Sequence, residues 1–255
     1  MPLTLPTMSL ITVCRNAELT IGETIKSVLL QRLEGVEYMI VDGASTDATG
    51  EIVAKFVGQG VDGFISEPDG GIADAFNKGV SRSTGDIIGL VNADDQLVED
   101  TVAFVRRYFH EHPDVDVVHG DVLLYEGQRF LKQLKPAGCW WHPWRLVLYN
   151  HPATFVRRRV YEELGGFDES FRIAMDVEIF LRWNRAGKHI QYLERPLAIM
   201  QVGGVSGVQA KAGFDEYRRA AILHGYSPVL ANIQYACKII LNTLVLLGRR
   251  YLPGI

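Results

Sequence analysis

The sequence lacks several features that would place a protein quickly in a class. It has only three cysteines, which are far apart and form neither a zinc-ligand spacing nor an even disulfide set. The N-terminus lacks both the basic region and the small-residue cleavage site of a signal peptide. We therefore expect a protein of the reducing cytoplasm.

The sequence also lacks an excess of positive charge. Its 26 Lys and Arg residues against 30 Asp and Glu residues give a formal net charge of −4, which argues against a nucleic-acid-coating protein. With 47% hydrophobic residues among 255, the composition is that of a globular protein with one large or two small domains. We expect no nucleic-acid partner.

Several catalytic motifs are absent. The patterns GxxxxGK[ST], HExxH and GxSxG do not occur, which disfavours a P-loop NTPase, a zinc protease and an α/β-hydrolase. Residues 58–63 match G-x-G-x-x-G, but they follow a predicted helix and precede a predicted strand. A dinucleotide site needs the opposite order, so a dehydrogenase is disfavoured as well.

The sequence does contain a regular alternation of short apolar runs and helical patterns. The runs predict buried strands at 10–13, 38–41, 64–66, 86–91 and 116–119, a hairpin at 122–125 and 130–134, and a strand at 190–193. Apolar spacings of three and four residues predict helices at about 20–29, 45–57, 72–80, 101–110, 160–164, 177–185 and 228–251. This alternation predicts an α/β fold built from βαβ units, with a mainly parallel sheet.

Polar residues follow the predicted strands where they end, and they include Arg15, Asn16, Asp42, Glu67, Asp69, Asn92 and Asp94. The carboxyl ends of parallel strands meet at one edge of a sheet, so we expect a site there. The adjacent carboxylates of Asp94 and Asp95 suit a hard divalent cation that also binds substrate phosphates. Turn formation would equally explain Asp42 and Asp69, and capping of the helix near Thr101 would explain Asp94 or Asp95.

The C-terminal tail differs from the rest. We expect residues 1–225 to form one domain and residues 226–255 to carry a separate helix. The apolar runs of that helix are too short to span a membrane. Lys238 and Asn242 lie on one face of it, which favours a helix at a membrane interface or against a second subunit; packing on its own domain is the alternative.

Four segments, residues 9–31, 37–49, 66–95 and 163–183, resemble the family 2 glycosyltransferases in order and spacing. The resemblance covers roughly residues 8–205. It implies a GT-A fold, in which a Rossmann-like mixed sheet is flanked by helices and the chain ends here in a helical tail. It further implies a nucleotide-sugar-binding half at 1–120 and an acceptor half at 121–225.

The resemblance also implies roles for individual residues in binding the donor. The predicted nucleotide contacts are Thr12, Val13, Asn16, Asp42, Asp69, Asn77, Lys78, Asn92 and Ala93. Asn92-Ala93-Asp94 stands where the family has its DXD motif, so Asp94 would hold a divalent metal, Mn²⁺ or Mg²⁺, on the donor diphosphate. Asn92 replaces the first Asp of that motif and is a poorer metal ligand.

On the acceptor side, Asp176 occupies the place of the family's catalytic base, with Glu178 as the weaker candidate. Met175 replaces the acidic residue that usually precedes the base, and an N-cap role is the alternative for Asp176. His151 and Trp141 are expected on the acceptor side. A QxxRW motif is absent, which favours transfer of one sugar over polymer synthesis.

The charge is unevenly distributed. Residues 1–100 carry a net charge of −10 and residues 101–255 a net charge of +6. Residues 127–161 contain seven Lys and Arg, four Trp and Tyr before residue 150, and no Asp or Glu. We expect the donor and its metal on the acidic side, and a polyprenyl-diphosphate acceptor with an anionic membrane surface on the basic side. A solvated basic face is the alternative.

The resemblance thus implies an inverting glycosyltransferase. It would move one sugar from a nucleotide-sugar, a UDP-sugar in the first instance, to a hydroxyl of a glycan or lipid-linked acceptor in the synthesis of an exopolysaccharide or O-antigen. We expect it in the cytoplasm, peripheral on the inner face of the plasma membrane. The C-terminal helix also leaves open the formation of an oligomer. The alternatives are a sugar nucleotidyltransferase, although Arg15-Asn16-Ala17 is not its glycine-rich basic loop, and a non-catalytic partner in an assembly complex.

Overall fold

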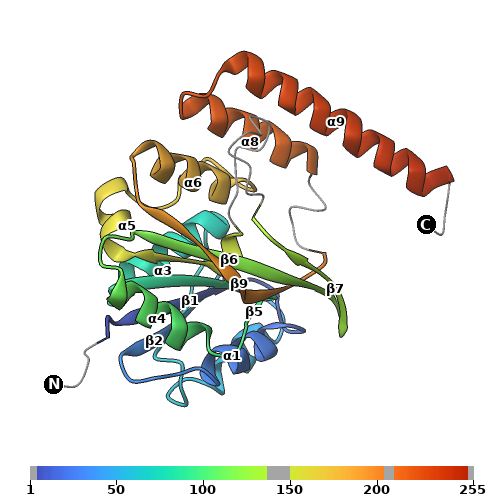
Figure 1. The fold of residues 1–255 in the computed structure, drawn as a ribbon. Coiled ribbons are helices and arrows are strands. Elements are labelled where there is room, and N and C mark those ends of the chain that lie inside the picture. The colour runs from blue at the N-terminus through green and yellow to red at the C-terminus, as the bar shows by residue number, and fades with distance from the viewer. Residues whose placement is uncertain (1–4, 137–149, 204–209, 252–255) are drawn as a thin grey trace.

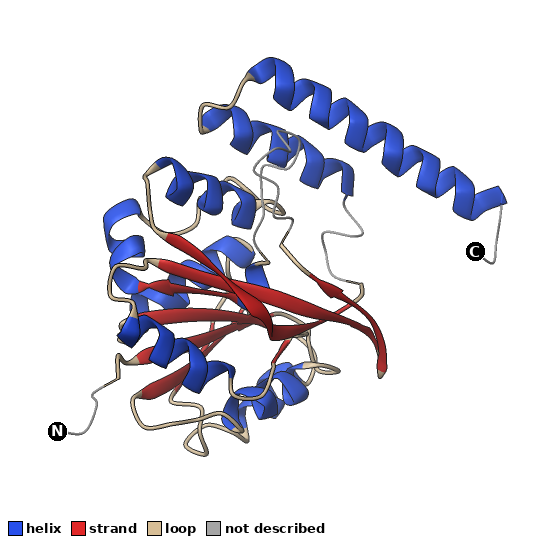
Figure 2. Cartoon of the chain, in the orientation of Figure 1, coloured by secondary structure: helices blue, strands red, loops and turns tan. Residues whose placement is uncertain are grey.

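The computed structural model describes residues 5–136, 150–203 and 210–251 of the chain. Within these residues the strands form one nine-stranded sheet, and helices pack on both of its faces (Figures 1 and 2). The strand order is β3-β2-β1-β4-β8-β6-β9-β5, and β7 pairs with β6 outside this path. The predicted α/β class is confirmed.

The first half of the sheet is parallel. It contains β1 (Met8–Cys14), β2 (Val36–Asp42), β3 (Gly63–Ser66) and β4 (Ile87–Asn92), which are joined by α1 (Ile21–Leu29), α2 (Thr49–Ala54) and α3 (Ile72–Arg82) and then lead to β5 (Gln96–Leu97). The strands β1, β2 and β4 are largely buried, which explains their runs of Val, Ile and Leu, whereas the edge strand β3 is only half-buried. The structure confirms the four predicted strands to within two residues at each end.

The second half of the sheet is mixed. It contains β6 (Val117–Glu126), β7 (Arg129–Leu134), β8 (Thr154–Arg157) and β9 (Ile190–Gln201). The strand β8 is antiparallel to β4 and β6, and β6 is parallel to β9. The prediction of a mainly parallel sheet is therefore right for the first half only, and β8 lies in a stretch where no strand was predicted.

Gly120 explains a second error of the sequence-based prediction. The strands predicted at 116–119 and 122–125 are one strand, β6, that runs through Gly120. A Cβ at this position would lie 2.7 Å from the carbonyl oxygen of Arg195 and 2.6 Å from Cγ of Leu197 in β9. The glycine permits a close approach of two strands and does not end one.

The helices divide between the two faces of the sheet. α1, α2 and α4 (Thr101–Glu111) cover one face, and α3, α5 (Arg158–Leu164) and α6 (Met175–Arg185) cover the other. Leu10 and Ile11 of β1 belong to the two opposite cores, as the alternation of side chains along a strand requires. α2 begins at Thr49 rather than at Ser45, because Oδ1 of Asp47 accepts hydrogen bonds from the backbone N–H and the hydroxyl of Thr49.

The chain ends in two helices, α8 (Ala210–Leu223) and α9 (Pro228–Tyr251), which pack against each other above α6 (Figure 1). The structure confirms α9 with its predicted bounds, whereas α8 was not predicted. No helix in the described part of the chain combines the length and the apolar character needed to cross a membrane. The boundary at residue 225 stays a prediction.

Candidate functional site

Four parallel strands end level with one another. Cys14 of β1 pairs with Asp42 of β2, and Asp42 pairs with Ser66 of β3. On the other side of β1, Val13 pairs with Asn92 of β4. The polar residues that follow these strands therefore share one edge of the sheet, as the sequence predicts. We call this edge the donor rim, meaning residues 14–16, 42–49, 66–71 and 92–95.

Asp42 organises the centre of the donor rim. Its buried carboxylate accepts hydrogen bonds from the Ser66 hydroxyl at 2.6 Å, from the Ser45 hydroxyl and from the Ser45 backbone N–H at 3.1 Å. The Cys14 thiol also donates to it at 3.8 Å, and burial together with the charge of Asp42 raises the pKa of that thiol. Asp42 thus fixes the turn that follows β2 and ties it to β1 and β3.

Asn16 and Asp69 shape the two loops beside this turn. Oδ1 of Asn16 accepts the backbone N–H of Thr46 at 2.9 Å, and Asn16 itself has a φ of 50°. Oδ1 of Asp69 accepts the backbone N–H of Gly71 at 2.9 Å. A Cβ at Gly43 would overlap the Asp69 carboxylate, so the glycine lets this side chain lie against the turn that follows β2. The rim therefore presents a closely packed acidic surface.

The turn at residues 92–95 is anchored by α1, and one of its two carboxylates, that of Asp94, is not used in holding it. The Thr24 hydroxyl of α1 bonds to the carbonyl oxygens of Ala93 and Asp95 at 2.9 and 2.8 Å. Asp95 is buried and accepts the Asn92 amide at 2.8 Å; burial and the charge of Asp94 raise its pKa to about 7. Asp94 is half-buried, and its carboxylate has no hydrogen bond or ion pair within the described residues.

These residues fit a divalent metal in the manner that the DXD resemblance implies. No group of three or more His, Cys, Asp or Glu side chains among the described residues could hold a metal alone. A hard cation on a nucleoside diphosphate needs only one or two carboxylates, because the phosphate oxygens complete its shell. Asp94, whose carboxylate has no bonded partner in the described part of the chain, is suited to be such a ligand, while Asn92 is held by Asp95.

Asp176 lies at the start of α6, where its Oδ1 accepts the backbone N–H of Val177 at 2.8 Å. Burial raises the pKa of Asp176, and the nearby imidazole of His151 opposes that rise. Burial also lowers the pKa of His151, against the effect of Asp176. The structure therefore brings the predicted base close enough to one predicted acceptor-side residue for each to affect the pKa of the other, and their predicted roles stay predictions.

Arg172 connects this carboxylate to the donor rim. Its guanidinium donates to the carbonyl oxygen of Gly70, in the loop that also carries Asp69. The segment that leads into Asp176 is therefore held directly against the rim. The two predicted halves of the site meet at this contact.

Glu216 of α8 is a residue that the sequence analysis missed. Its carboxylate accepts three backbone N–H groups, from Arg172, Ile173 and Ala174, at 2.9, 2.8 and 2.8 Å. These are the residues immediately before α6, so Glu216 holds the N-terminal end of the helix that carries Asp176. The residues around Glu216 in the sequence carry no pattern that points to a functional site, so no local signal could have identified it.

Several predicted site residues are engaged in the scaffold. The buried hydroxyl of Thr12 bonds to Tyr38 at 2.9 Å, and Val13 lies in the core. The Asn77 amide exchanges two hydrogen bonds with the backbone of Phe167, at 2.9 and 2.7 Å. Lys78 donates to the carbonyl oxygen of Pro68 at 2.8 Å. Their predicted roles toward a nucleotide stay predictions.

Glu178 is also engaged. It is 3% exposed and pairs with Arg182 at 2.7 Å and with His224, the residue that follows α8, at 2.9 Å. This network joins α6 to the end of α8. Trp141, together with the basic and aromatic residues at 139–149, lies outside the described residues.

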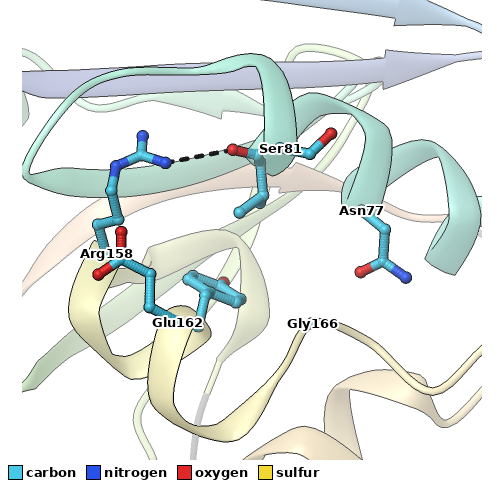
Figure 3. A pocket seen from close by; sticks show the side chains of 7 residues that line it. Asn77, Ser81, Arg158, Glu162 and Gly166 are labelled. Carbon is cyan, nitrogen blue, oxygen red and sulfur yellow. Dashed lines mark hydrogen bonds between the residues drawn. The ribbon is translucent and has the colours of Figure 1, made fainter.

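One cavity lies away from these residues. It has a volume of about 360 Å³ and lies between α3 and α5, where Asn77 and Ser81 face Arg158, Tyr161 and Glu162 (Figure 3). Arg158 is already bonded to the carbonyl oxygens of Gly85 and Val80. Apart from Asn77, none of the predicted site residues lines this cavity.

Comparison with known sequences agrees with the resemblance. The model of the family described as "Glycosyl transferase family 2" matches residues 9–181. A "PGL/p-HBAD biosynthesis glycosyltransferase" of Mycobacterium bovis is 30% identical over 182 residues, which are 69% of each chain. The "O-antigen biosynthesis protein RfbC" of Myxococcus xanthus is 27% identical over 228 residues, covering 85% of this chain and 17% of that protein.

Solved structures show the same fold. TarS residues 1–349 of S. aureus, in complex with UDP-GlcNAc, matches with a TM-score of 0.69 at 18% identity, over 91% of this chain and 71% of that one. The mannosyltransferase PcManGT of Pyrobaculum calidifontis, in complex with GDP-Man and Mn²⁺, matches with a TM-score of 0.66 at 18% identity, over 97% and 81%. The chain has the GT-A fold, and because the family model covers more than half of it, the chain belongs to glycosyl transferase family 2 and is a glycosyltransferase.

Proposed function

We propose that the chain is an inverting glycosyltransferase that moves one sugar from a nucleotide-sugar, a UDP-sugar in the first instance, to an acceptor hydroxyl. The single observation that carries this proposal is the environment of Asp176. A carboxyl group with a raised pKa stands at the start of α6, beside His151, on a segment that Arg172 holds against the donor rim.

Asp176 acts as the general base. An alcohol is a poor nucleophile, and a positioned carboxylate that takes its proton during attack accelerates such reactions by about 10²–10⁴-fold. A raised pKa brings the proton affinity of Asp176 closer to neutral pH, where a general base is most effective. Attack opposite the leaving group inverts the anomeric carbon without a covalent sugar–enzyme intermediate.

The donor rim binds the nucleotide and its diphosphate. Asp94 would hold the divalent metal, Mn²⁺ or Mg²⁺, which supplies Lewis-acid stabilisation of the charge on the leaving diphosphate. Asp42 fixes the turn after β2, and Asp69 fixes the adjoining loop. The Mn²⁺ that PcManGT holds together with GDP-Man supports this assignment.

The acceptor is a glycan or a lipid-linked sugar in the synthesis of a surface polysaccharide or glycolipid. The names of the mycobacterial relative and of RfbC support this class of pathway. The basic stretch at 127–161 adds no independent support for an anionic acceptor, because Arg157 and Arg158 donate to backbone carbonyl oxygens and Arg159 pairs with Asp116. We place the reaction in the cytoplasm, at the inner face of the membrane that carries such acceptors.

A panel of UDP- and GDP-sugars tests the proposal. The full-length protein is incubated with each donor, Mn²⁺ and lipid-linked acceptors, and released nucleoside diphosphate and product linkage are measured. We expect one donor to react, with a product of inverted anomeric configuration. Release of pyrophosphate from a nucleoside triphosphate and a sugar phosphate would identify a nucleotidyltransferase instead, and no turnover of any donor would favour the non-catalytic partner.

A further inference from the structure

His151 and Trp183 each bury a ring nitrogen that has no hydrogen-bond partner within the described residues. The atoms are Nε2 of His151 and Nε1 of Trp183, and both are shielded from solvent. Buried polar atoms of this kind are uncommon in folded proteins, because the hydrogen bond that each loses to bulk water is not replaced. Each of the two nitrogens therefore needs an explanation.

Both side chains line the same small cavity. Its volume is about 10 Å³, and the rest of its wall consists of apolar side chains of β4, β8 and α6 together with Thr154 and Tyr161. A buried water molecule needs roughly 10–15 Å³ of space and two to four polar partners. The cavity has room for one water molecule.

The polar groups around the cavity suit such a water molecule. The indole N–H of Trp183 can only donate, whereas Nε2 of a neutral imidazole can accept. Burial lowers the pKa of His151, which keeps its imidazole neutral at physiological pH. The Thr154 hydroxyl donates to the carbonyl oxygen of Asn150 at 2.8 Å, so its oxygen is able to accept. A water molecule that accepts from Trp183 can therefore donate to both His151 and Thr154.

The spacing of residues on α6 connects this cavity to Asp176. Four residues recur at three- and four-residue intervals and share one face of the helix, namely Asp176, Ile179, Phe180 and Trp183. The last three of them line the cavity, and Trp183 lies two turns, or roughly 10 Å, beyond Asp176 along the axis. His151 lines the same cavity and is near enough to Asp176 to affect its pKa. This places the imidazole between the proposed base and the indole.

Packing fixes the orientation of the imidazole. Its ring centre lies 5.4 Å from that of Phe76 and 6.4 Å from that of Phe167, at steep angles of 61° and 81°. The loop that carries Phe167 is held in turn by the side-chain amide of Asn77. The ring of His151 is therefore held in place, and the position of its proton is what its hydrogen-bond partners decide.

We propose that one resident water molecule bridges Nε1 of Trp183 and Nε2 of His151, and that this bridge makes Trp183 a positioning residue for Asp176. The water donates to Nε2, so the imidazole carries its proton on Nδ1. The Nδ1–H group then faces Asp176 and favours its ionised form, which is the form that acts as a base. The inference rests on the proposed function and deepens it, because it adds a residue that acts on the proposed base through His151.

Nuclear magnetic resonance of the full-length protein with ¹⁵N-labelled histidine tests this proposal. At neutral pH, long-range correlations between ring protons and ring nitrogens show which nitrogen carries the proton, and His151→Gln assigns the signal. We expect the Nδ1–H form in the wild type, and a nuclear Overhauser effect from a long-lived water to the indole N–H of Trp183. A proton on Nε2, or the lack of that effect, would overturn the proposal without any variant.

Trp183→Phe keeps an aromatic ring and removes the indole N–H. The water lone pair that accepted this N–H can then accept Nε2–H, so both forms of the imidazole become populated. We expect kcat to fall by about two- to tenfold, the effect of one hydrogen bond, at an unchanged KM for the donor. Leu181→Val is the matched control, because Leu181 is buried in the same core on α6 but does not line the cavity. Its histidine signal and kcat should equal the wild type.

Two results with these variants would refute the positioning role: an unchanged histidine signal in Trp183→Phe, or an equal loss of kcat in Leu181→Val. Thermal unfolding checks that both variants are folded. The spectra are recorded without donor, which separates this inference from the proposed function. A wild-type protein with the bridging water and the Nδ1–H form that turns over no donor would refute the proposed function alone, whereas donor turnover by a protein with the Nε2–H form would refute this inference alone.

Discussion

The donor rim and the Asp176 side of the site are stabilised by contacts of different range. Asp42 is held by Ser45 and Ser66, which are three and 24 residues away in the sequence. The segment before Asp176 is held by Glu216, 43 residues beyond Ile173, and the loop at Phe167 is held by Asn77, 90 residues before it. The turn after β2 is thus held by nearby segments, and the rim turn at 92–95 is held by Thr24 of α1, 69 and 71 residues before Ala93 and Asp95. The catalytic side depends throughout on contacts between distant segments.

This difference separates two kinds of acidic residue. On the rim, Asp42 and Asp69 accept hydrogen bonds from neighbouring turns, and Asp94 alone of the three has no such partner within the described chain. Near α6, Glu216 is used entirely for positioning, and Asp176 keeps one carboxylate oxygen beyond its bond to Val177. In both regions, the carboxylate to which we assign a chemical role accepts fewer hydrogen bonds from the described residues than its acidic neighbours do.

The largest expected effect is on the Asp176 side. Asp176→Asn keeps the shape of the side chain but removes its ability to take a proton, so the transfer rate should fall by about 10²–10⁴-fold. Single-turnover kinetics with saturating donor measures it. Wild-type turnover in this variant would eliminate Asp176 as the base and leave Glu178 to be tested next.

On the rim, Asp94→Asn should weaken Mn²⁺-dependent binding of UDP. Loss of a residue that only orients a metal ligand costs about 10–100-fold in metal affinity, so loss of the ligand itself should cost at least about 100-fold. Titration of UDP at several Mn²⁺ concentrations measures the effect. Asp100→Asn is the control, since Asp100 is exposed and has a φ of 63° that Asn adopts readily.

Glu216→Gln should produce a smaller effect of a kind that mere loss of stability cannot imitate. The charge of Glu216 contributes to the raised pKa of Asp176. The carboxylate is the active form, so activity declines as the pH falls through this pKa; removing the Glu216 charge lowers the pKa and moves that decline to lower pH. A pH profile of kcat measures the shift, and an unmoved profile with normal kcat would refute the positioning role.

The smallest effect is expected at Thr12. Its hydroxyl is buried against Tyr38, so Thr12→Val should lower the free energy of unfolding by about 1–3 kcal/mol by leaving the phenol unpaired. Because this hydroxyl is buried and bonded to Tyr38, we expect the affinity for UDP to stay at the wild-type value, contrary to the nucleotide contact that the resemblance implies. Denaturant unfolding and UDP titration measure the two quantities, and a lower affinity at unchanged stability would show that Thr12 contacts the nucleotide.

The same contrast explains how much of the molecule the sequence could predict. The strands β1–β4 and the acidic residues after them follow from apolar runs and turn chemistry, which are local properties. The sequence predicts two strands on either side of Gly120 where the structure has one. A glycine is needed there because β9 approaches closely, and no local pattern reveals that approach.

The site was predictable to the same extent. Asp42, Asp69, Asn92 and Asp94 do share one edge of the sheet, because parallel strands place them there. Glu216 and His224 could not be found, since each acts on residues more than 40 positions away. The sequence also could not predict which face of α9 packs on α8, because both faces of α9 are consistent with a helix at the surface.

The central claim is that donor binding and proton transfer belong to separate parts of this site. Calorimetric titration of UDP with Mn²⁺ into Asp176→Asn tests it most directly. We predict a dissociation constant within about twofold of the wild type in a variant that no longer transfers sugar. A loss of UDP affinity as large as that of Asp94→Asn would contradict it.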